Sequence, residues 1–297
     1  MIYRVRHTTR YAYAGTVELA SHLLHLRPRG MPGQRVLASA VVADPPATRQ
    51  RDRLDHFGNH VTWLCVDTPH AVFEVTGEAT VEVGFPAPPE ATATPSWEAV
   101  AALARAGGPL GWEAAEFTFE SPMVPLELAA AEFAAPSFPA GRPVLEALLE
   151  LNGRIRREFA YRSGVTDLAT PVAEVLRRRE GVCKDFSHVM ISALRTLGLP
   201  ARYVSGYIRT YPPPGQPRRR GSDQSHAWVG CWLGPEHGWI GLDPTNDAVV
   251  REEHLVVGWG RDYGDVSPVS GIVLGGGAHR LSIAVDLEPV AAPVAAD

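Results

Sequence analysis

The stretch "GVCKDFSHVMISALRTLGLPARYVSGYI", residues 181–208, constrains the fold more than any other part of the chain. Its apolar residues recur at the three- and four-residue spacing of an amphipathic helix: Val182, Phe186, Val189, Met190, Ala193, Leu194 and Leu197. Gly198 is typical of a helix end, and "LPARYVSGYI" after it predicts a short strand. The stretch therefore predicts a helix that begins near a single cysteine, Cys183, and leads directly into a strand.

The length of the chain, 297 residues, exceeds that of one average domain, so we expect two packed units or one enlarged α+β body. Hydrophobic residues make up 45% of the sequence and charged residues 21%, as in an ordinary globular protein. The net charge of -5 and the lack of a long basic face give no attraction to nucleic acid or to an anionic membrane. We therefore expect neither as a partner.

The cysteine content and the N-terminus suggest a reducing compartment. The opening "MIYRVRHTTRYAYAG" lacks the apolar core of a signal peptide, and no later stretch has the length and apolar character of a membrane span. Cys65, Cys183 and Cys231 show no CxxC spacing, which argues against a disulfide framework and a structural zinc ribbon. We expect a cytoplasmic protein.

Residues 1–85 have the pattern of an antiparallel β domain. Apolar residues alternate with arginines from Tyr3 to Tyr13, and residues 73–85 alternate apolar residues with Glu and Thr. Residues 34–44 and 59–67 are predicted strands as well, separated by the turn-forming segments "DPP" and "FGN". These patterns predict a sheet with one wet face.

The chain changes character at residues 86–143, which are rich in Ala, Pro and Gly and include one predicted helix at 96–106. We interpret this segment as a connector that wraps the two units. Residues 144–297 form the second unit. It begins with an amphipathic helix over 144–159, and a further helix is predicted from an N-cap at Thr170 with Pro171 in the first position to Gly181.

Cys183 lies in the first turn of its predicted helix, on the side that faces the core. Backbone N–H groups are unpaired at this end of a helix, so they lower a thiol pKa and can hydrogen-bond an oxyanion. Placement alone favours a packed, inert thiol, because cysteine is among the most often buried residues. A catalytic role requires further residues.

Two segments downstream supply them. "SHAWVGCWL" places His226 and Trp228 on one face of a strand, and "GWIGLDPTND" ends its strand at Asp243. If Leu233 pairs with Gly238 across a four-residue hairpin loop, Trp228 faces Asp243 and His226 lies diagonally beside it. A shift of one residue would turn Asp243 to the other face.

These residues match the needs of nucleophilic catalysis. A thiol needs a base, and an imidazole needs a carboxylate that fixes its tautomer, which gives Cys183, His226 and Asp243 their roles. Trp228 can shield the His–Asp pair from water, although an aromatic residue on a strand is more often ordinary core. Cys231 faces away from His226 and, like Cys65, is interpreted as packing.

Together, "GVCKDFSHVMISALRTLGLPARYVSGY", "SHAWV" and "GWIGLDPTN" resemble the core of the transglutaminase-like superfamily. The resemblance implies a papain-like fold, in which a helix bearing Cys183 packs on an antiparallel sheet bearing His226 and Asp243. The later "GWGRDYGDVSPVSG" and the N-terminal β domain with "LHLRPR" resemble the bacterial branch that carries its own N-terminal domain. The similarity thus spans nearly the whole chain.

The resemblance also draws attention to neighbours of the three residues. Asp185 and His188 match the family block, and His188 is expected to be structural because it lies about a turn and a half from Cys183. Lys184 departs from the glutamine common in the family; we expect an exposed, solvated cation, with stabilisation of a thiolate as the alternative. The residues of the "GRDY" block either line the cleft or support folding through an Arg–Asp pair: Arg261, Asp262 and Tyr263.

The cysteine triad predicts acyl transfer through a thioester, and in the bacterial branch hydrolysis of a peptide or other amide is implied. Transfer to an amine, a non-catalytic module, and a zinc site formed by Cys183, His188, His226 and Asp243 remain as alternatives. We expect neither a metal nor a cofactor. The chain has no calcium-loop pattern, which argues against a calcium-regulated transglutaminase.

Two features of the expected cleft stay open. The Cys183 N–H is one oxyanion donor, and Tyr161, Gln224 or another backbone amide is a candidate for the second. Residues 209–224 are predicted to border the cleft, where Arg218, Arg219 and Arg220 either engage an acidic substrate or form a solvated loop.

Overall fold

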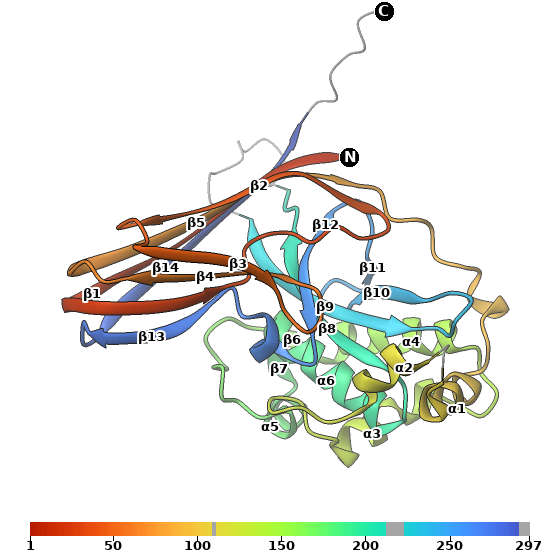
Figure 1. The fold of residues 1–297 in the computed structure, drawn as a ribbon. Helices are drawn as coiled ribbons and strands as arrows, with labels where there is room; N and C mark the ends of the chain where they lie inside the picture. Colours follow the sequence, from red (N-terminus) through yellow and green to blue (C-terminus); the bar gives the residue numbers. More distant parts are fainter. Residues whose placement is uncertain (109–110, 212–222, 291–297) are drawn as a thin grey trace, which may run out of the picture.

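A computed structural model of the chain describes residues 1–108, 111–211 and 223–290, with the Gln224 side chain outside that description. It contains two antiparallel sheets and a layer of helices, arranged so that the first sheet projects to the left in Figure 1 and the helices cover the second sheet at the lower right. The fold is therefore α+β, as expected from the sequence. Among the described residues, no helix combines the length and the apolar character needed to cross a membrane.

The N-terminal sheet is built around one long strand. Its strands within the first 83 residues are β1 (Ile2–Leu24), β2 (Gln34–Asp44), β3 (Arg49–Leu54), β4 (His60–Val66) and β5 (His70–Val83). They run in the order β2-β5-β1-β4-β3. The strand β1 extends beyond the predicted 3–13 because partners flank both of its halves: β5 pairs with the first half and β4 with the second.

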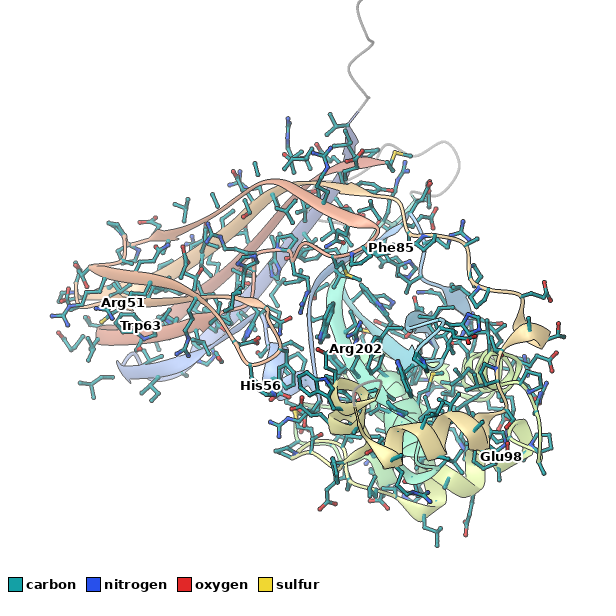
Figure 2. All side chains as sticks on the ribbon, turned by 45° about the vertical axis from the view of Figure 1, so that its right-hand side comes forward. Arg51, His56, Trp63, Phe85, Glu98 and Arg202 are labelled. Atoms are coloured by element: carbon teal, nitrogen blue, oxygen red, sulfur yellow. The ribbon has the colours of Figure 1, made fainter. Side chains whose placement is uncertain are left out.

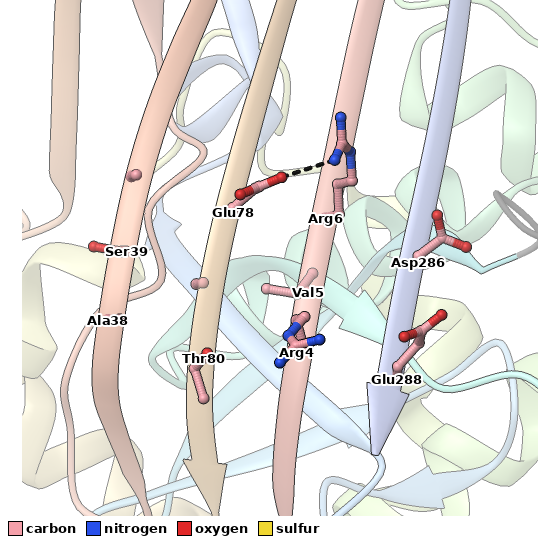
Figure 3. A pocket seen from close by; sticks show the side chains of 11 residues that line it. Arg4, Val5, Arg6, Ala38, Ser39, Glu78, Thr80, Asp286 and Glu288 are labelled. Atoms are coloured by element: carbon pink, nitrogen blue, oxygen red, sulfur yellow. Dashed lines mark hydrogen bonds and ion pairs between the residues drawn. The ribbon is translucent and has the colours of Figure 1, made fainter. Parts of the chain in front are cut away.

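The predicted alternation in β1 is confirmed. Tyr3 and Val5 are buried, whereas Arg4 and Arg6 are exposed on the outer face, where Arg6 forms a 2.9 Å ion pair with Glu78. Figure 3 shows these charged side chains around a shallow hollow on the face of the sheet. The inner face packs on the second unit through a cluster that includes Tyr207 and Leu255.

Two strands from the end of the chain complete the first sheet: β13 (Val269–Gly275) and β14 (His279–Val290). Both pair with β1, β14 along its first half and β13 along its second. These strands fall within the predicted unit 144–297, yet they belong to the first sheet. Their partners in β1 lie more than 240 positions away, so no local sequence pattern indicates the pairing. The strand β3 was missed as well, since all its residues are exposed and it shows no apolar alternation.

The connector carries η1 (Ala91–Ala93), α1 (Trp97–Ala106), α2 (Trp112–Ala115), η2 (Glu116–Thr118), α3 (Leu128–Ala134) and η3 (Ala135–Ser137). The helix α1 confirms the prediction at 96–106, and Ser96 caps it by accepting a hydrogen bond from Ala99 N–H. Apolar residues of this segment, among them Val100 and Phe133, join the core beneath the second sheet.

The second unit contains α4 (Val144–Glu158), β6 (Ala160–Tyr161), α5 (Val172–Arg178), β7 (Glu180–Gly181), α6 (Cys183–Thr196), β8 (Ala201–Ile208), β9 (Gln224–Trp232), β10 (Trp239–Asp243), β11 (Ala248–Val249), β12 (His254–Gly260) and η4 (Tyr263–Val266). Its sheet has the order β11-β10-β9-β8-β12. The helix α6 lies against β8 and β9 (Figure 1), with a core formed by residues such as Met190 and Val229. The predicted helices at 144–159 and after Gly181 are confirmed.

The helix α5 differs from its prediction at both ends. Pro171 is the N-cap in place of Thr170, because Pro171 has the extended backbone of an N-cap residue and the helix begins at Val172. The helix ends at Arg178 because Arg179 adopts a left-handed conformation with φ of 57°. The following β7 then pairs in parallel with β6, and this short bridge delivers the chain to Cys183.

The N-terminal sheet is tied to the second sheet along the edge strand β12. The Gln34 side chain donates to Val256 O at 2.7 Å and accepts from Val256 N at 2.8 Å. The Asn59 side chain likewise donates to Trp259 O at 2.8 Å and accepts from Trp259 N at 3.0 Å. Two amide side chains thus hydrogen-bond the backbone edge that a sixth strand would otherwise occupy.

Candidate active site

Cys183 occupies the first position of α6, directly after the N-cap residue Val182. Its side chain is partly buried and lines a pocket, unlike that of Cys231, which is fully buried in the core. The first N–H groups of a helix have no partner within the helix, so the Cys183 amide points its hydrogen out of this end. The partial positive charge of the helix N-terminus therefore lies next to the Cys183 side chain.

Asp185 holds the start of this helix in place. Its Oδ2 accepts hydrogen bonds from Val182 N at 2.9 Å and from Thr166 Oγ1 at 2.6 Å. Lys184 lies beside it, with Nζ 3.0 Å from Asp185 Oδ1 and 2.7 Å from Asp167 O. The expectation of an exposed, solvated Lys184 is wrong, because these two partners hold the ammonium group and leave the residue only 8% exposed.

The strands β9 and β10 form the hairpin in the predicted register. Leu233 pairs with Gly238 across the loop, and Ile240 stands opposite Cys231. This register brings His226 Nε2 to 2.7 Å from Asp243 Oδ2. Because Asp243 engages Nε2, Nδ1 is the ring nitrogen available to Cys183, which lines the same pocket as His226.

The Asp243 carboxylate is fully buried and saturated with donors. Its Oδ1 accepts from the backbone N–H groups of Thr245 and Asn246 at 2.9 and 3.2 Å. Its Oδ2 accepts from the Asn246 side chain at 2.7 Å and lies 3.3 Å from His254 Nε2. Sequence reasoning missed His254 and Asn246; the "DPTN" turn is a signal for Asn246, whereas His254 has no local signal.

The charges of this pair follow from its surroundings. Burial lowers the pKa of His226, but the hydrogen bonds to Asp243 and Cys183 outweigh it and raise that pKa to about 10. Burial raises the pKa of Asp243, yet His226, followed by His254, brings it well below its usual range. Both shifts favour a charged imidazolium–carboxylate pair at neutral pH.

Trp228 packs against the histidines of this site. Its ring centroid lies 6.0 Å from that of His226 and 5.2 Å from that of His254. Trp228 is almost fully buried, and a Cβ atom at Gly206 would press on its ring. Trp228 is therefore a core residue that also packs against His226, which agrees with both interpretations of Trp228 from the sequence.

The remaining family-block residues mostly support the structure around the site. His188 accepts a hydrogen bond from Tyr263 N at 3.2 Å, and burial, followed by the charge of Lys184, lowers its pKa to about 3. A neutral His188 that accepts a backbone hydrogen bond is structural, as expected. Asp262 accepts hydrogen bonds from the backbone N–H groups of Met123 and Gly264 at 3.0 and 2.8 Å.

An ion pair between Arg261 and Asp262 does not form. Arg261 instead pairs with Asp265, at 2.9 Å from both Nε and Nη2, because the turn at η4 brings the residue four positions on back to the guanidinium. Of the "GRDY" block, Tyr263 lines the pocket that contains Cys183. Arg261 and Asp262 are absent from that lining.

Tyr161 and Gln224 are the side chains predicted as a second oxyanion donor. Tyr161 is 46% exposed and contacts Phe186 edge to face, and it does not line the pocket of Cys183. The backbone of Gln224, the first residue of β9, pairs with Ile208 of β8, but the Gln224 side chain lies outside the described residues. Arg218, Arg219 and Arg220 also lie outside them.

The pocket of Cys183 has a volume of about 420 Å³ and receives residues from both units. Cys183, Lys184, Tyr203 and His226 come from the second unit, while His7 and Ile283 come from the N-terminal sheet. His7 hydrogen-bonds Tyr207 Oη at 3.0 Å, and burial lowers its pKa to about 4. The first sheet thus forms a neutral, largely apolar wall of the site.

The described residues that could hold a metal ion differ from the predicted zinc ligands. The group of described residues able to hold a cation is His226, Asp243 and His254, whose ligand atoms lie within 4.8 Å of one another. His188 accepts a hydrogen bond from Tyr263 N and does not belong to this group, so the structure does not bring the four predicted zinc ligands together. Hydrogen bonds already satisfy the carboxylate in the group.

Comparisons with known proteins identify the family. A model of the transglutaminase-like superfamily matches residues 133–244, and one of the bacterial transglutaminase-like N-terminal region matches residues 3–82. An uncharacterized protein of Mycobacterium tuberculosis is 42% identical over 295 residues, covering 97% of this chain and 92% of its own length. The chain belongs to the transglutaminase-like superfamily. A relative from Mycobacterium leprae is 31% identical over 97% of this chain and 99% of its own.

Further similarities concern the fold of this transglutaminase-like protein. A crystal structure of a proposed cysteine protease from Cytophaga hutchinsonii superimposes with a TM-score of 0.76 at 20% identity, covering 100% of this chain and 94% of the other. A protein-glutamine gamma-glutamyltransferase of Pseudomonas aeruginosa is 40% identical over 68 residues, which is 23% of this chain and 10% of that protein. The transglutaminase-like match includes Cys183, His226 and Asp243, and it ends one residue after Asp243.

Proposed function

We propose that this transglutaminase-like protein hydrolyses an amide bond through a cysteine–histidine–aspartate triad. The observation that carries the proposal is the 2.7 Å hydrogen bond between His226 and Asp243, with His226 interacting in turn with Cys183 at the start of α6. This arrangement supports the roles of Cys183 as nucleophile, His226 as base and Asp243 as the group that orients the base, which acyl transfer requires.

The proposed reaction starts from a Cys183 thiolate and a His226 imidazolium. The sulfur attacks the carbonyl carbon, and the resulting oxyanion accepts a hydrogen bond from the Cys183 N–H. His226 then gives its proton to the departing amine as the C–N bond breaks, which leaves a thioester on Cys183. Neutral His226 next takes a proton from water as the water attacks the thioester, and the carboxylic acid product leaves with the thiolate and imidazolium restored.

Asp243 and its neighbours keep His226 ready for both steps. The carboxylate fixes the ring with Nδ1 toward the sulfur and stabilises the imidazolium. Its own orientation is set by two backbone N–H groups and the Asn246 amide. We assign His254 a positioning role through its contact with Asp243 Oδ2.

Transfer of the acyl group to an amine is the second candidate. It uses the same thioester, with an amine in place of water, and the short match to a protein-glutamine gamma-glutamyltransferase favours it. The likeness to the Cytophaga hutchinsonii protein, described as a proposed cysteine protease, agrees with hydrolysis. The substrate we propose is a peptide or a protein-derived amide.

Labelling with a peptidyl acyloxymethyl ketone at neutral pH tests the proposal. Wild-type protein should be labelled once, Cys183→Ala not at all, and His226→Ala at a rate lower by at least a hundredfold. Cys231→Ala and Cys65→Ala serve as matched controls and should label like wild type. Labelling of Cys183→Ala, or full-rate labelling of His226→Ala, would contradict the triad.

A second measurement separates the two candidates. A peptide library with a fluorescent primary amine present should yield mainly free carboxylic acid if the enzyme is a hydrolase. Amine-bearing product in excess of the acid would instead assign it as a transferase.

A further inference from the structure

A second cavity lies on the opposite face of the sheet that carries the candidate active site. It has a volume of about 520 Å³ and is bounded by the five-stranded sheet and by residues 85–89 at the start of the connector. Figure 2 labels Phe85 and Arg202, which line it from these two sides. Along β8, Tyr203 and Ser205 face the pocket of Cys183, while Arg202 and Val204 face this cavity. The two sites are therefore separate.

Arg202 is the unusual residue of this cavity. It is only 8% exposed, and its guanidinium lies between two indole rings, with Cζ 4.2 Å from the centroid of Trp239 and 3.7 Å from that of Trp259. Among the residues that the structure describes, none hydrogen-bonds or forms an ion pair with Arg202, and its Nε is buried without a partner. Aromatic stacking stabilises the two faces of the cation but leaves its N–H groups unsatisfied.

An unpaired buried charge is costly, and here a second cation lies nearby. The Arg29 guanidinium lies 3.2 Å from the Trp259 ring centroid, although Arg29 does donate hydrogen bonds to Phe57 O and Asn59 Oδ1. Burial, and then the charge of Arg29, lowers the pKa of Arg202 well below its usual range. The acidic residue that lines the cavity, Glu113, is exposed and makes no ion pair with Arg202. Among the described residues no carboxylate hydrogen-bonds this guanidinium, so the cavity can accept an anion beside Arg202.

Apart from His237, the rest of the lining is apolar or glycine. It consists largely of prolines, tryptophans and aliphatic side chains, among them Pro86, Pro88, Trp228, Ile240 and Val256. Because two indole rings stack on the Arg202 guanidinium, we expect a ligand to meet its N–H edge. That edge matches a planar acceptor with two oxygens.

We propose that this cavity binds a small molecule that carries one carboxylate on an apolar body, with the carboxylate paired to the edge of Arg202 and the body between the proline-rich segment and the sheet. The volume is adequate for a molecule of this kind, and a few polar groups in an apolar cavity are typical of ligand sites. The inference is independent of the proposed amide hydrolysis.

Titration of the wild-type protein with 4-phenylbutyrate tests the proposal, with calorimetry and tryptophan fluorescence as readouts. Saturable one-to-one binding is expected, with the neutral 4-phenylbutyramide at least tenfold weaker and inorganic phosphate without effect. Equal binding of acid and amide, no binding of the acid, or tight binding of phosphate would each overturn it. This comparison needs no variant, so it holds even where a substitution impairs folding.

A matched pair of variants then assigns the residue. Arg202→Met keeps the length and the packing of the side chain, and it should weaken 4-phenylbutyrate binding at least tenfold while leaving binding of the amide unchanged. Arg51→Met removes an exposed arginine of β3, labelled in Figure 2, and should leave both affinities as in wild type. Undiminished binding of the acid by folded Arg202→Met would overturn the assignment.

Discussion

The Nε2 atom of His254 lies 3.3 Å from Asp243 Oδ2, the oxygen that also accepts a hydrogen bond from His226. His254 comes from β12, on the far side of β8 from β9, and still reaches the carboxylate. A second histidine at this oxygen reduces the freedom of Asp243 to rotate away from His226.

The first prediction concerns this contact. His254→Phe removes a donor to a buried carboxylate, so the labelling rate of Cys183 should fall about tenfold, equivalent to roughly 1.4 kcal/mol. His254→Gln keeps an N–H donor and should recover most of the rate. If the two variants label equally fast and both match wild type, His254 does not position Asp243.

The second prediction concerns the charge of His226. Asp243→Asn removes the carboxylate that contributes most to the stability of the imidazolium, so the pKa of His226 should fall well below about 10. Ring 15N chemical shifts measured against pH report this change directly. Asp265→Asn, which removes the partner of Arg261, is the matched control and should leave His226 unchanged.

The third prediction links the same pair to stability. The folded protein binds the His226 proton more tightly than the unfolded chain does, so this contribution is fully present below about pH 6.5 and is lost as the pH rises toward about 10. Within that window His226 should lower the free energy of unfolding by up to about 1.4 kcal/mol per pH unit. Urea unfolding at several pH values should show this slope in wild type and not in His226→Gln. A slope that persists in the variant would assign it to other groups.

The fourth prediction concerns the room that Gly206 leaves for Trp228. A Cβ atom at position 206 would clash with Leu255 O and with the Trp228 ring. Gly206→Ala should therefore lower the free energy of unfolding by about 1–3 kcal/mol and slow the labelling of Cys183, because Trp228 packs on His226. Gly84→Ala, where a Cβ atom meets nothing within 4 Å, is the matched control and should unfold like wild type.

The fifth prediction concerns the start of α6. Asp185→Ala leaves Val182 N–H, Thr166 and the buried Lys184 without their carboxylate, and it should destabilise the protein by roughly 1–3 kcal/mol and reduce labelling of Cys183. Glu174→Ala removes a first-turn acid of α5 whose arginine partners are exposed, and little change is expected there. Thermal unfolding and labelling rates distinguish the two.

Local patterns were sufficient for the parts of the site that depend on nearby residues. The hairpin that joins His226 to Asp243 follows from alternation and from a short loop, and the apolar spacing of α6 places Cys183 at its start. Long-range pairing was not readable in this way. The strands β13 and β14 join β1 because the chain returns to the first sheet at its end. His254 reaches Asp243 because β12 joins the second sheet beyond β8, and this order of strands has no local signal.

Lys184 shows a different limit of sequence reasoning. A lysine near a helix start is normally solvated, and its burial depends on Asp167 O, a backbone atom that a loop brings to it from 17 positions earlier. No residue pattern around position 184 indicates that this loop lies close to Lys184. The same holds for Arg202, whose two tryptophan partners come from β10 and β12.

The amide side chains of Gln34 and Asn59 have a consequence for how the two units depend on each other. They occupy the backbone groups of β12 that would otherwise be open to strand addition from another molecule. An isolated second unit would present this edge to its neighbours, so we expect the N-terminal sheet to keep the second unit from associating with itself through β12.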